Sequence, residues 1–234
     1  MAWWLARDYG YAGPGFDWLY EDNVEEKRGL VGSGLSLSRP LSEKNVPKAA
    51  RYREKYPKPP APDIFFVDSA TTVTARFKAL VEEFEPGLHL FAPIELQFHD
   101  GTAMPGEYYF FNCNVDVDCV LTDNKPEWFR ETRYGKIHPS LGLIQKLTPL
   151  EISLSKPQIE GRHLWTGGPL GWNQLFVSDA FCKALRKGRF GAVDIRRECH
   201  EVDRLWVAEE HMGPLIEAWK TYVAHNRNCE AGYI

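Results

Sequence analysis

The sequence predicts an α+β fold with a mixed or antiparallel sheet, two strand-cap-helix-strand units and a C-terminal helix. Short runs of strand type, either apolar or alternating, occur along the chain between glycine and proline turns. Two of these runs are each followed by a helix-capping residue and an apolar repeat of helical spacing. Because a chain of 234 residues with 44% hydrophobic residues can bury its own core, we expect a single domain over residues 1–234.

The first strand-cap-helix-strand unit begins with an apolar strand over residues 64–67. The polar residues that follow this strand are candidate helix N-caps: Asp68, Ser69, Thr71 and Thr72. Apolar residues at helical spacing then predict a helix over residues 73–84. Alternation over residues 94–98 predicts a half-exposed strand. Asp100-Gly101 predicts a hairpin turn before a partner strand over residues 107–111.

The second unit has the same order of elements. An apolar strand is predicted over residues 175–177, and Ser178 and Asp179 are candidate caps for the helix that follows it. That helix is predicted over residues 180–187 and a further strand over residues 190–196. The letters before the two helices are similar, Phe-Val-Asp-Ser and Phe-Val-Ser-Asp. This is an internal echo of one supersecondary unit and not a solenoid, because the third copy that such an array needs is missing.

Three peripheral segments complete the predicted organisation. Residues 2–6 read as a short aromatic strand. From about residue 40 to 62, six prolines and six basic residues predict an extended connection, because proline excludes a central strand or a long helix. One helical turn is expected within it, near residues 49–55. An appended C-terminal helix is predicted over about residues 214–226, with Pro214 suited to its first turn.

Charge and cysteine usage indicate the compartment and the class of partner. A formal net charge of -4, from 28 basic and 32 acidic residues, gives no overall attraction to nucleic acid or to an anionic membrane. We find no signal-peptide core and no apolar stretch of membrane-spanning length, so we expect a cytoplasmic protein. The odd number and irregular spacing of the cysteines suit buried thiols in a reducing compartment: Cys113, Cys119, Cys182, Cys199 and Cys229.

Candidate catalytic and metal-binding groups are few. Asp116 and Asp118 lie on one face of an extended segment and could hold a divalent cation, although a solvated acidic turn is the favoured interpretation. Glu95 and His99 could act as base and acid, although an ordinary wet strand face is favoured. The cysteines and histidines lack the spacing of zinc ligands. We therefore expect no metal, no cofactor and no enzymatic activity.

Two further features could serve binding. The basic run over residues 44–58, with Tyr52 and Tyr56 between its cations, could contact nucleic acid, although a solvated linker is favoured. Several tryptophans lie beside glycine or proline in loop-like context: Trp128, Trp165 and Trp172. Aromatic rings of this kind usually pack in a core, but when exposed beside carboxylates they can anchor a protein interface.

A series of soft motifs resembles the bacterial polymorphic-toxin immunity family numbered eleven, first described from a myxobacterial protein. The resemblance covers about residues 63–198. It rests on seven segments: DIFFV at 63–67, RFKAL at 76–80, IELQF at 94–98, GEYYFFN at 106–112, VDCV at 117–120, GRHLW at 161–165 and LFVSD at 175–179. These motifs consist of apolar and capping residues, so they bear on fold and carry over no catalytic residue.

The resemblance implies an antidote that binds a cognate bacterial toxin domain in the cytoplasm and blocks it by steric and electrostatic complementarity. Toxin domains that act on nucleic acid often present basic clefts, so surface carboxylates and aromatic anchors are the natural contacts. The candidates are Asp116, Asp118, Trp128, Trp165, Trp172, Glu198, Glu201 and Asp203. Two alternatives stay open: an enzyme that uses carboxylates near Asp116, Asp118 and Glu95, and a nucleic-acid-associated protein that uses residues 44–58.

Overall fold

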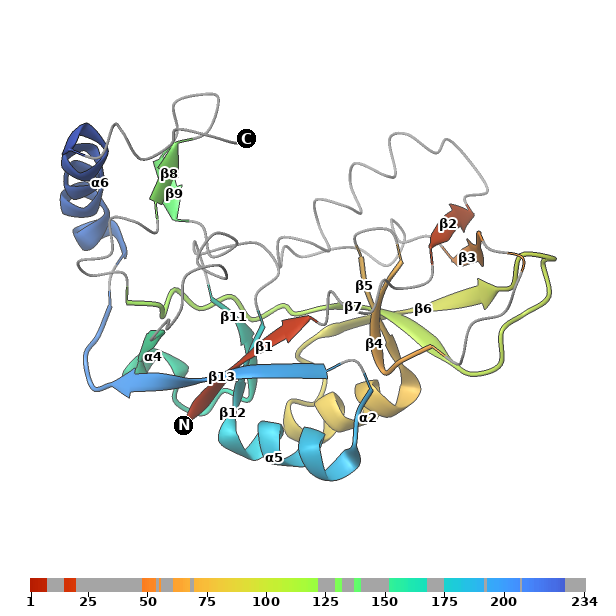
Figure 1. Cartoon of the computed structure of the whole chain (residues 1–234). Helices are drawn as coiled ribbons and strands as arrows, with labels where there is room; N and C mark the ends of the chain where they lie inside the picture. Colours follow the sequence, from red (N-terminus) through yellow and green to blue (C-terminus); the bar gives the residue numbers. More distant parts are fainter. Residues whose placement is uncertain are drawn as a thin grey trace.

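The structure, a computed structural model of the chain, contains two main sheets flanked by helices (Figure 1). It describes residues 1–7, 15–19, 48–53, 55, 61–67, 70–121, 129–131, 137–139, 152–167, 175–191, 193–206 and 208–225. Sheets and helices contribute to the same core, which confirms the α+β fold class. In the described part of the chain, no helix has both the length and the apolar character that a membrane span requires.

The first sheet has five strands with β1 at its centre. Their order is β10 (Ser153–Ser155), β13 (Val193–Val202), β1 (Ala2–Arg7), β12 (Leu175–Ser178) and β11 (Leu164–Thr166). β1 is antiparallel to both of its neighbours, and β10 runs parallel to β13. The predicted aromatic strand at the N-terminus is thus confirmed, and the fully buried ring of Trp4 places it in the core.

The segment over residues 115–121 connects the two edges of this sheet. At one end, the backbone N–H of Val117 donates to the carbonyl of Thr166 in β11 at 2.9 Å. At the other end, the N–H of Leu121 donates to the carbonyl of Ser153 in β10 at 2.9 Å. Both edge strands therefore have hydrogen-bonded neighbours, and buried residues of this segment, such as Cys119 and Val120, belong to the first core cluster.

The second sheet has six strands. Their order is β2 (Phe16–Leu19), β3 (Ala49–Tyr52), β6 (Leu90–Gln97), β7 (Tyr108–Asn112), β5 (Ala70–Thr74) and β4 (Ile64–Val67). The predicted hairpin is confirmed, because β6 and β7 pair antiparallel and Gly101 takes the positive φ of 88° in the turn between them. A small separate sheet pairs β8 (Phe129–Glu131) with β9 (Ile137–Pro139).

Two helices of ten residues lie side by side against the sheets (Figure 1). They are α2 (Ala75–Phe84) and α5 (Asp179–Gly188). Phe181 of α5 packs edge-on against Phe84 and Phe77 of α2, with ring centroids 5.1 and 6.4 Å apart. These rings belong to or pack against the first core cluster, which contains residues of both sheets. The two predicted strand-cap-helix units therefore meet in one core.

The first predicted helix begins two residues later than expected, at Ala75 instead of residue 73. Residues 70–74 form strand β5, which pairs with β4 on one side and β7 on the other, so the helix begins only after Thr74. Thr74 is the N-cap, and its hydroxyl accepts from the N–H of Phe77. In the second unit Ser178 is the N-cap as predicted, and its hydroxyl accepts from the N–H of Phe181. The similarity between the two units therefore extends to their helix caps, and Thr74 is the residue that corresponds to Ser178.

The prediction for residues 49–52 was also wrong. These residues form β3, which lies between β2 and β6 inside the second sheet, where a helical turn in an extended connection was expected. No proline occurs between Pro47 and Pro57, so this stretch keeps all of its backbone donors for strand pairing. Ala50 and Tyr52 alternate into the core while Arg51 stays exposed.

The C-terminal helix is longer than predicted. Helix α6 (Ala208–His225) begins six residues before Pro214, which therefore lies inside the helix and not in its first turn. Proline inside a helix removes one backbone hydrogen bond, and packing has to offset that loss. Leu215 is buried and Trp219 packs against the first core cluster, so the helix docks on the body of the molecule.

Candidate functional site

The predicted carboxylates lie along the edges and ends of the first sheet. Asp116 is exposed beside β11, where one of its oxygens accepts from the Thr166 hydroxyl at 2.7 Å. This contact fixes the carboxylate of Asp116 against the sheet edge. The predicted turn is seen only around Asp118, where the N–H of Cys119 donates to the carbonyl of Val117 at 2.8 Å. Asp116 is instead extended and forms an isolated parallel bridge with Thr166.

Asp118 and Asp203 are brought to one region by Gln158. This residue, in the short helix α4 (Lys156–Ile159), donates from its amide to the carbonyl of Asp118 at 2.8 Å and to that of Trp206 at 2.7 Å. Its own carbonyl oxygen accepts from the N–H of Trp206 at 3.1 Å. Ser155 holds the same segment, because its hydroxyl donates to the carbonyl of Arg204 at 2.6 Å. One glutamine thus joins the turn that carries Asp118 to the segment that carries Asp203.

Glu198 and Glu201 occupy two different settings on β13. Glu198 is exposed on the strand, whereas Glu201 is half-buried and pairs with the α-amino group of Met1 at 3.0 Å. Glu201 also lines an open pocket of about 260 Å³, together with Ile159, Arg162, His163 and Asp179. The pocket contains both signs of charge, so it has no net preference for an anion or a cation.

The three predicted aromatic anchors do not form an exposed set. Trp165 lies in β11 with 0% of its surface exposed and stacks on Phe176, with ring centroids 6.1 Å apart. A ring this deep in the core cannot contact a partner, so the prediction for Trp165 was wrong. Gly167, which gave this stretch its loop-like pattern, comes directly after the end of β11 at Thr166. Trp128 and Trp172 lie outside the described residues.

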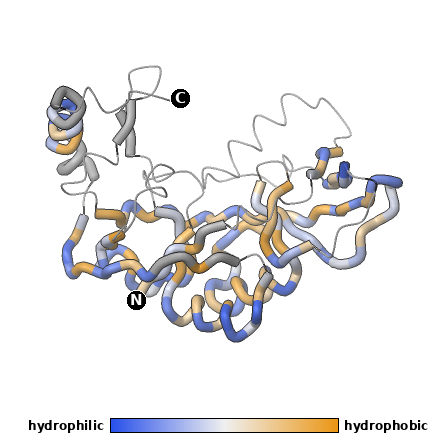
Figure 2. Tube along the Cα trace, viewed as in Figure 1, coloured by the Kyte–Doolittle hydropathy of each residue, from blue (hydrophilic) through white to orange (hydrophobic). Residues whose placement is uncertain are grey.

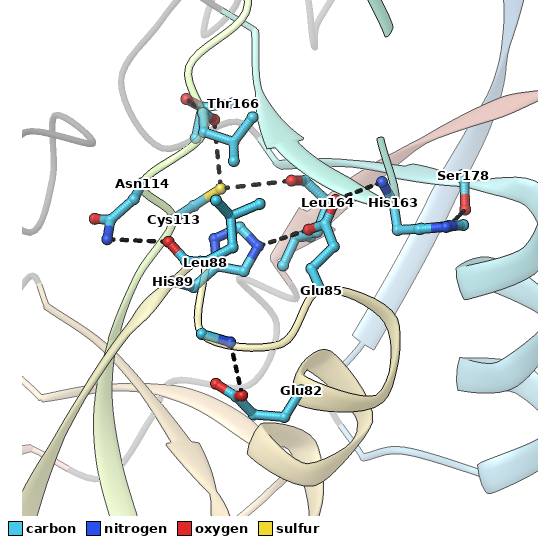
Figure 3. A network of polar contacts seen from close by, with 12 residues as sticks. Glu82, Glu85, Leu88, His89, Cys113, Asn114, His163, Leu164, Thr166 and Ser178 are labelled. Atoms are coloured by element: carbon cyan, nitrogen blue, oxygen red, sulfur yellow. Dashed lines mark hydrogen bonds and ion pairs between the residues drawn. The ribbon is translucent and has the colours of Figure 1, made fainter. Parts of the chain in front are cut away.

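A buried polar network connects segments that are distant in the sequence (Figure 3). One carboxylate oxygen of Glu85, at the end of α2, lies 2.6 Å from Nε2 of His89, and the other accepts from the backbone N–H of His163 at 2.7 Å. Nδ1 of His163 lies 2.9 Å from the hydroxyl of Ser178, which caps α5. The network therefore ties the ends of α2, β11 and β12 together.

The charged form of Glu85 is favoured inside this network. Burial raises the pKa of the Glu85 carboxyl, but hydrogen bonds from His89 and from the backbone N–H groups of His163 and Leu164 outweigh it, so the pKa is lowered. Nδ1 of His89 is buried and has no hydrogen-bond partner among the described residues, which places the ring proton on Nε2 facing Glu85. A buried carboxylate with these partners is well satisfied.

This network resembles a catalytic triad in composition but not in geometry. Glu85 binds the backbone N–H of His163 and not its ring, so it cannot orient that imidazole as a triad acid does. The Ser178 hydroxyl accepts from the N–H of Phe181 as a helix cap. These contacts describe a structural junction. The sequence signalled Ser178 through its capping position, whereas nothing in the local sequence linked it to His163.

The buried thiols are poor nucleophiles and poor metal ligands. Burial raises the pKa of Cys113, Cys119 and Cys199 to about 12, and the Trp165 indole offsets this only in part at Cys119. The thiol of Cys182 is also buried and its pKa is raised for the same reason. Among the described residues, no group of three or more His, Cys, Asp or Glu side chains is arranged to hold a metal ion.

Glu95 and Asp116, two carboxylates named in the enzyme hypothesis, lie on different sheets and do not form one active site. Glu95 lies on β6 of the second sheet, where its carboxylate accepts from the side chain of Gln97 at 2.7 Å. Asp116 lies beside β11 of the first sheet. Two cations of the basic run are likewise engaged, since Arg51 donates to Gln97 at 2.9 Å and Arg53 pairs with Asp17 at 2.7 Å.

Comparison with protein families identifies the chain. Residues 19–200, more than half of the sequence, match the immunity protein family Imm11. The chain belongs to this family. A comparison with curated proteins found no match. Membership of an immunity family fits a protein whose described polar groups form structural junctions, and it implies that the chain serves immunity against a toxin.

Proposed function

We propose that this Imm11 protein binds a cognate toxin domain and blocks it by steric and electrostatic complementarity, without chemistry of its own. Family membership over residues 19–200 carries the proposal. The polar network around Glu85 supports it, because its serine and histidines cap and join secondary structure. The buried thiols, with pKa values raised to about 12 at Cys113 and Cys119, also suit a binding protein.

The carboxylates around the first sheet are the proposed contacts. Glu198 and Asp203 are exposed, and Asp118 is held near the segment of Asp203 by Gln158. Asp116 is exposed, and its carboxylate is fixed by the Thr166 hydroxyl. The carboxylate of Asp116 is already held in place, so it loses little conformational freedom on binding and suits a basic surface on the partner.

The proposed partner acts in the cytoplasm, where the chain itself is proposed to reside. Free buried thiols at four described cysteines suit a reducing compartment. An antidote of this compartment would meet a toxin whose target lies there, such as a nucleic acid or a cofactor. We do not expect the antidote to contact nucleic acid, because its own net charge is -4.

Charge reversal on the acidic surface tests the proposal. We expect Glu198→Lys combined with Asp203→Lys to weaken binding to the toxin of the adjacent gene by about tenfold or more and to reduce protection on co-expression, because the reversed charges repel a basic cleft. The matched control is Glu83→Lys, an exposed carboxylate on α2. Thermal midpoints of all variants should stay close to that of the wild type.

Two outcomes contradict the proposal. The first is full toxin binding by the double variant, which would move the contact elsewhere. The second is a folded His163→Gln or Cys119→Ala variant that keeps toxin binding but loses protection, which would mean that neutralisation needs a reaction. Isothermal titration for binding and colony counts for protection separate the two.

A further inference from the structure

The end of α5 concentrates positive charge in a chain of opposite net charge. Residues 179–190 contain four basic residues and one carboxylate, whereas the whole chain has a formal net charge of -4. Figure 2 shows hydrophilic residues along the outer side of this helix. The four basic side chains are Lys183, Arg186, Lys187 and Arg189. The helix macrodipole favours positive charge at the C-terminal end of a helix, but one or two cations in the last turn already supply this stabilisation.

Three of these cations have no carboxylate partner among the residues that the structure describes. Lys183 is neutralised by Asp179, with a nitrogen-oxygen distance of 2.7 Å. Arg186, Lys187 and Arg189 are exposed, and within the described part of the chain no carboxylate pairs with any of them. Like charges so close together repel one another, so this arrangement is less stable than one with a carboxylate among them. We call these three residues the basic end of α5.

Neighbouring aromatic rings hold the guanidinium groups at this site. The Arg186 guanidinium lies over the ring of Trp3, 4.5 Å from its centroid. The Arg76 guanidinium lies over Phe190 at 4.2 Å and donates to the carbonyl of Gly188. Stacking limits the rotamers of an arginine before any ligand arrives, so less conformational entropy is lost on binding.

Arg189 occupies a backbone position that favours glycine. Its φ is 52°, and among the described residues it is the one non-glycine residue with a positive φ. Glycine is the usual residue where a helix ends in this left-handed conformation, and other side chains are disfavoured there. The neighbouring Gly188 has a separate role, because a Cβ there would lie 2.4 Å from the Phe190 ring. An arginine at a position where glycine is better for stability suggests a use for its charge.

We propose that the basic end of α5 binds an acidic segment of a protein partner. The guanidinium and ammonium groups would receive carboxylates, and Arg186, fixed on Trp3, would supply a planar pair of donors to one of them. This contact uses cations of this chain, whereas the toxin surface proposed above uses its carboxylates. The two surfaces adjoin, because Glu198 is the cross-strand partner of Trp3. Variants at Lys187 and Arg189 leave those carboxylates unchanged, so the two proposals are tested independently.

Carboxylates fit this site better than nucleic acid does. Binding of single-stranded nucleic acid combines several phosphate contacts with rings that stack on bases. The two rings at this site, Trp3 and Phe190, are already covered by arginines. Three unneutralised cations are also few for a protein that would depend on phosphate contacts alone.

Titration with a fluorescent oligoglutamate peptide tests the proposal, with oligothymidylate of the same length as the competing class. We expect the double variant Lys187→Gln/Arg189→Gly to weaken the peptide dissociation constant roughly fivefold, since two exposed charge pairs are lost. The matched control is Lys220→Gln, an exposed cation on α6 that pairs with Glu217 at 2.7 Å. Binding to the wild type should weaken as salt rises.

Arg189→Gly separates a functional charge from a structural one. We expect this single variant to keep or raise the thermal midpoint, because glycine relieves the left-handed backbone, while peptide binding becomes weaker. Equal loss of binding in the double variant and in Lys220→Gln would overturn the proposal. Tighter binding of oligothymidylate than of oligoglutamate, or no measurable peptide binding at low salt, would also overturn it.

Discussion

Among single residues, Glu85 joins parts of the chain that the sequence keeps far apart. Its carboxylate contacts His89 four residues away and the backbone of His163 78 residues away. Because the hydrogen bonds to Glu85 hold its pKa below the ordinary value in the folded protein, folding is linked to its ionisation. This linkage gives a stability that is present above the unfolded pKa and is lost as the pH falls through the lower, folded pKa.

The first prediction concerns Glu85→Gln. We expect the free energy of unfolding at pH 7 to fall by about 1–3 kcal/mol, because the buried partners lose a charged acceptor. The difference from the wild type should shrink in acid, since the protonated wild-type carboxyl no longer gains from the network. Urea unfolding of both proteins at neutral and acidic pH measures this. A difference that stays constant with pH would mean that the charge of Glu85 contributes nothing.

At the scale of elements, the two helix starts have the same construction. Thr74 and Ser178 are each the last residue of a strand, and each hydroxyl accepts from the N–H of a phenylalanine three residues later. Phe77 and Phe181 then contact one another between the helices. Each cap thus fixes a helix start and also positions a ring that fills the shared core.

The second prediction concerns these caps. We expect Thr74→Ala and Ser178→Ala each to lower the free energy of unfolding by about 1 kcal/mol, because each leaves a helix N–H without its acceptor. The two losses should be similar, because each hydroxyl also makes a second contact: Thr74 donates to the carboxylate of Asp63 at 2.8 Å, and Ser178 lies 2.9 Å from Nδ1 of His163. Thr74→Ser keeps the hydroxyl and serves as the control. Equal stability of Thr74→Ala and Thr74→Ser in chemical denaturation would contradict the capping role.

For the whole molecule, the question is whether the two sheets unfold together. The first core cluster contains residues from both sheets, including Trp4 and Trp165 of the first and Phe111 of the second. The second cluster lies within the six-stranded sheet, where Tyr52 packs against Phe16 with ring centroids 5.5 Å apart. A shared cluster and the network around Glu85 predict one cooperative unit.

The third prediction uses Tyr52→Ala to test this cooperativity. Truncating a fully buried ring should cost about 3 kcal/mol. We expect tryptophan fluorescence, to which the buried rings of the first sheet contribute, and far-ultraviolet circular dichroism to shift to the same lower midpoint. The control is Arg51→Ala, an exposed neighbour on the same strand. A fluorescence midpoint that stays unchanged would divide the chain into two folding units.

The sequence by itself determined the features that depend on neighbours along the chain. The hairpin at Asp100-Gly101, the cap at Ser178 and the helix after it were predicted correctly, because turns and caps are formed by residues a few positions apart. The resemblance to an immunity family was likewise present in the order of local motifs, and the family match confirms it.

Only the tertiary structure decided which segments become neighbours and which side chains are buried. Local propensity placed a helical turn at residues 49–55 and a helix start before Thr74, but pairing with distant strands made β3 and β5 instead. Because a glycine follows it closely, Trp165 was predicted to be an interface anchor in a loop. In the structure it is a core residue that stacks on Phe176. Strand pairing and burial arise between residues far apart in the chain, and their summed energy exceeds the small preferences that a local sequence expresses.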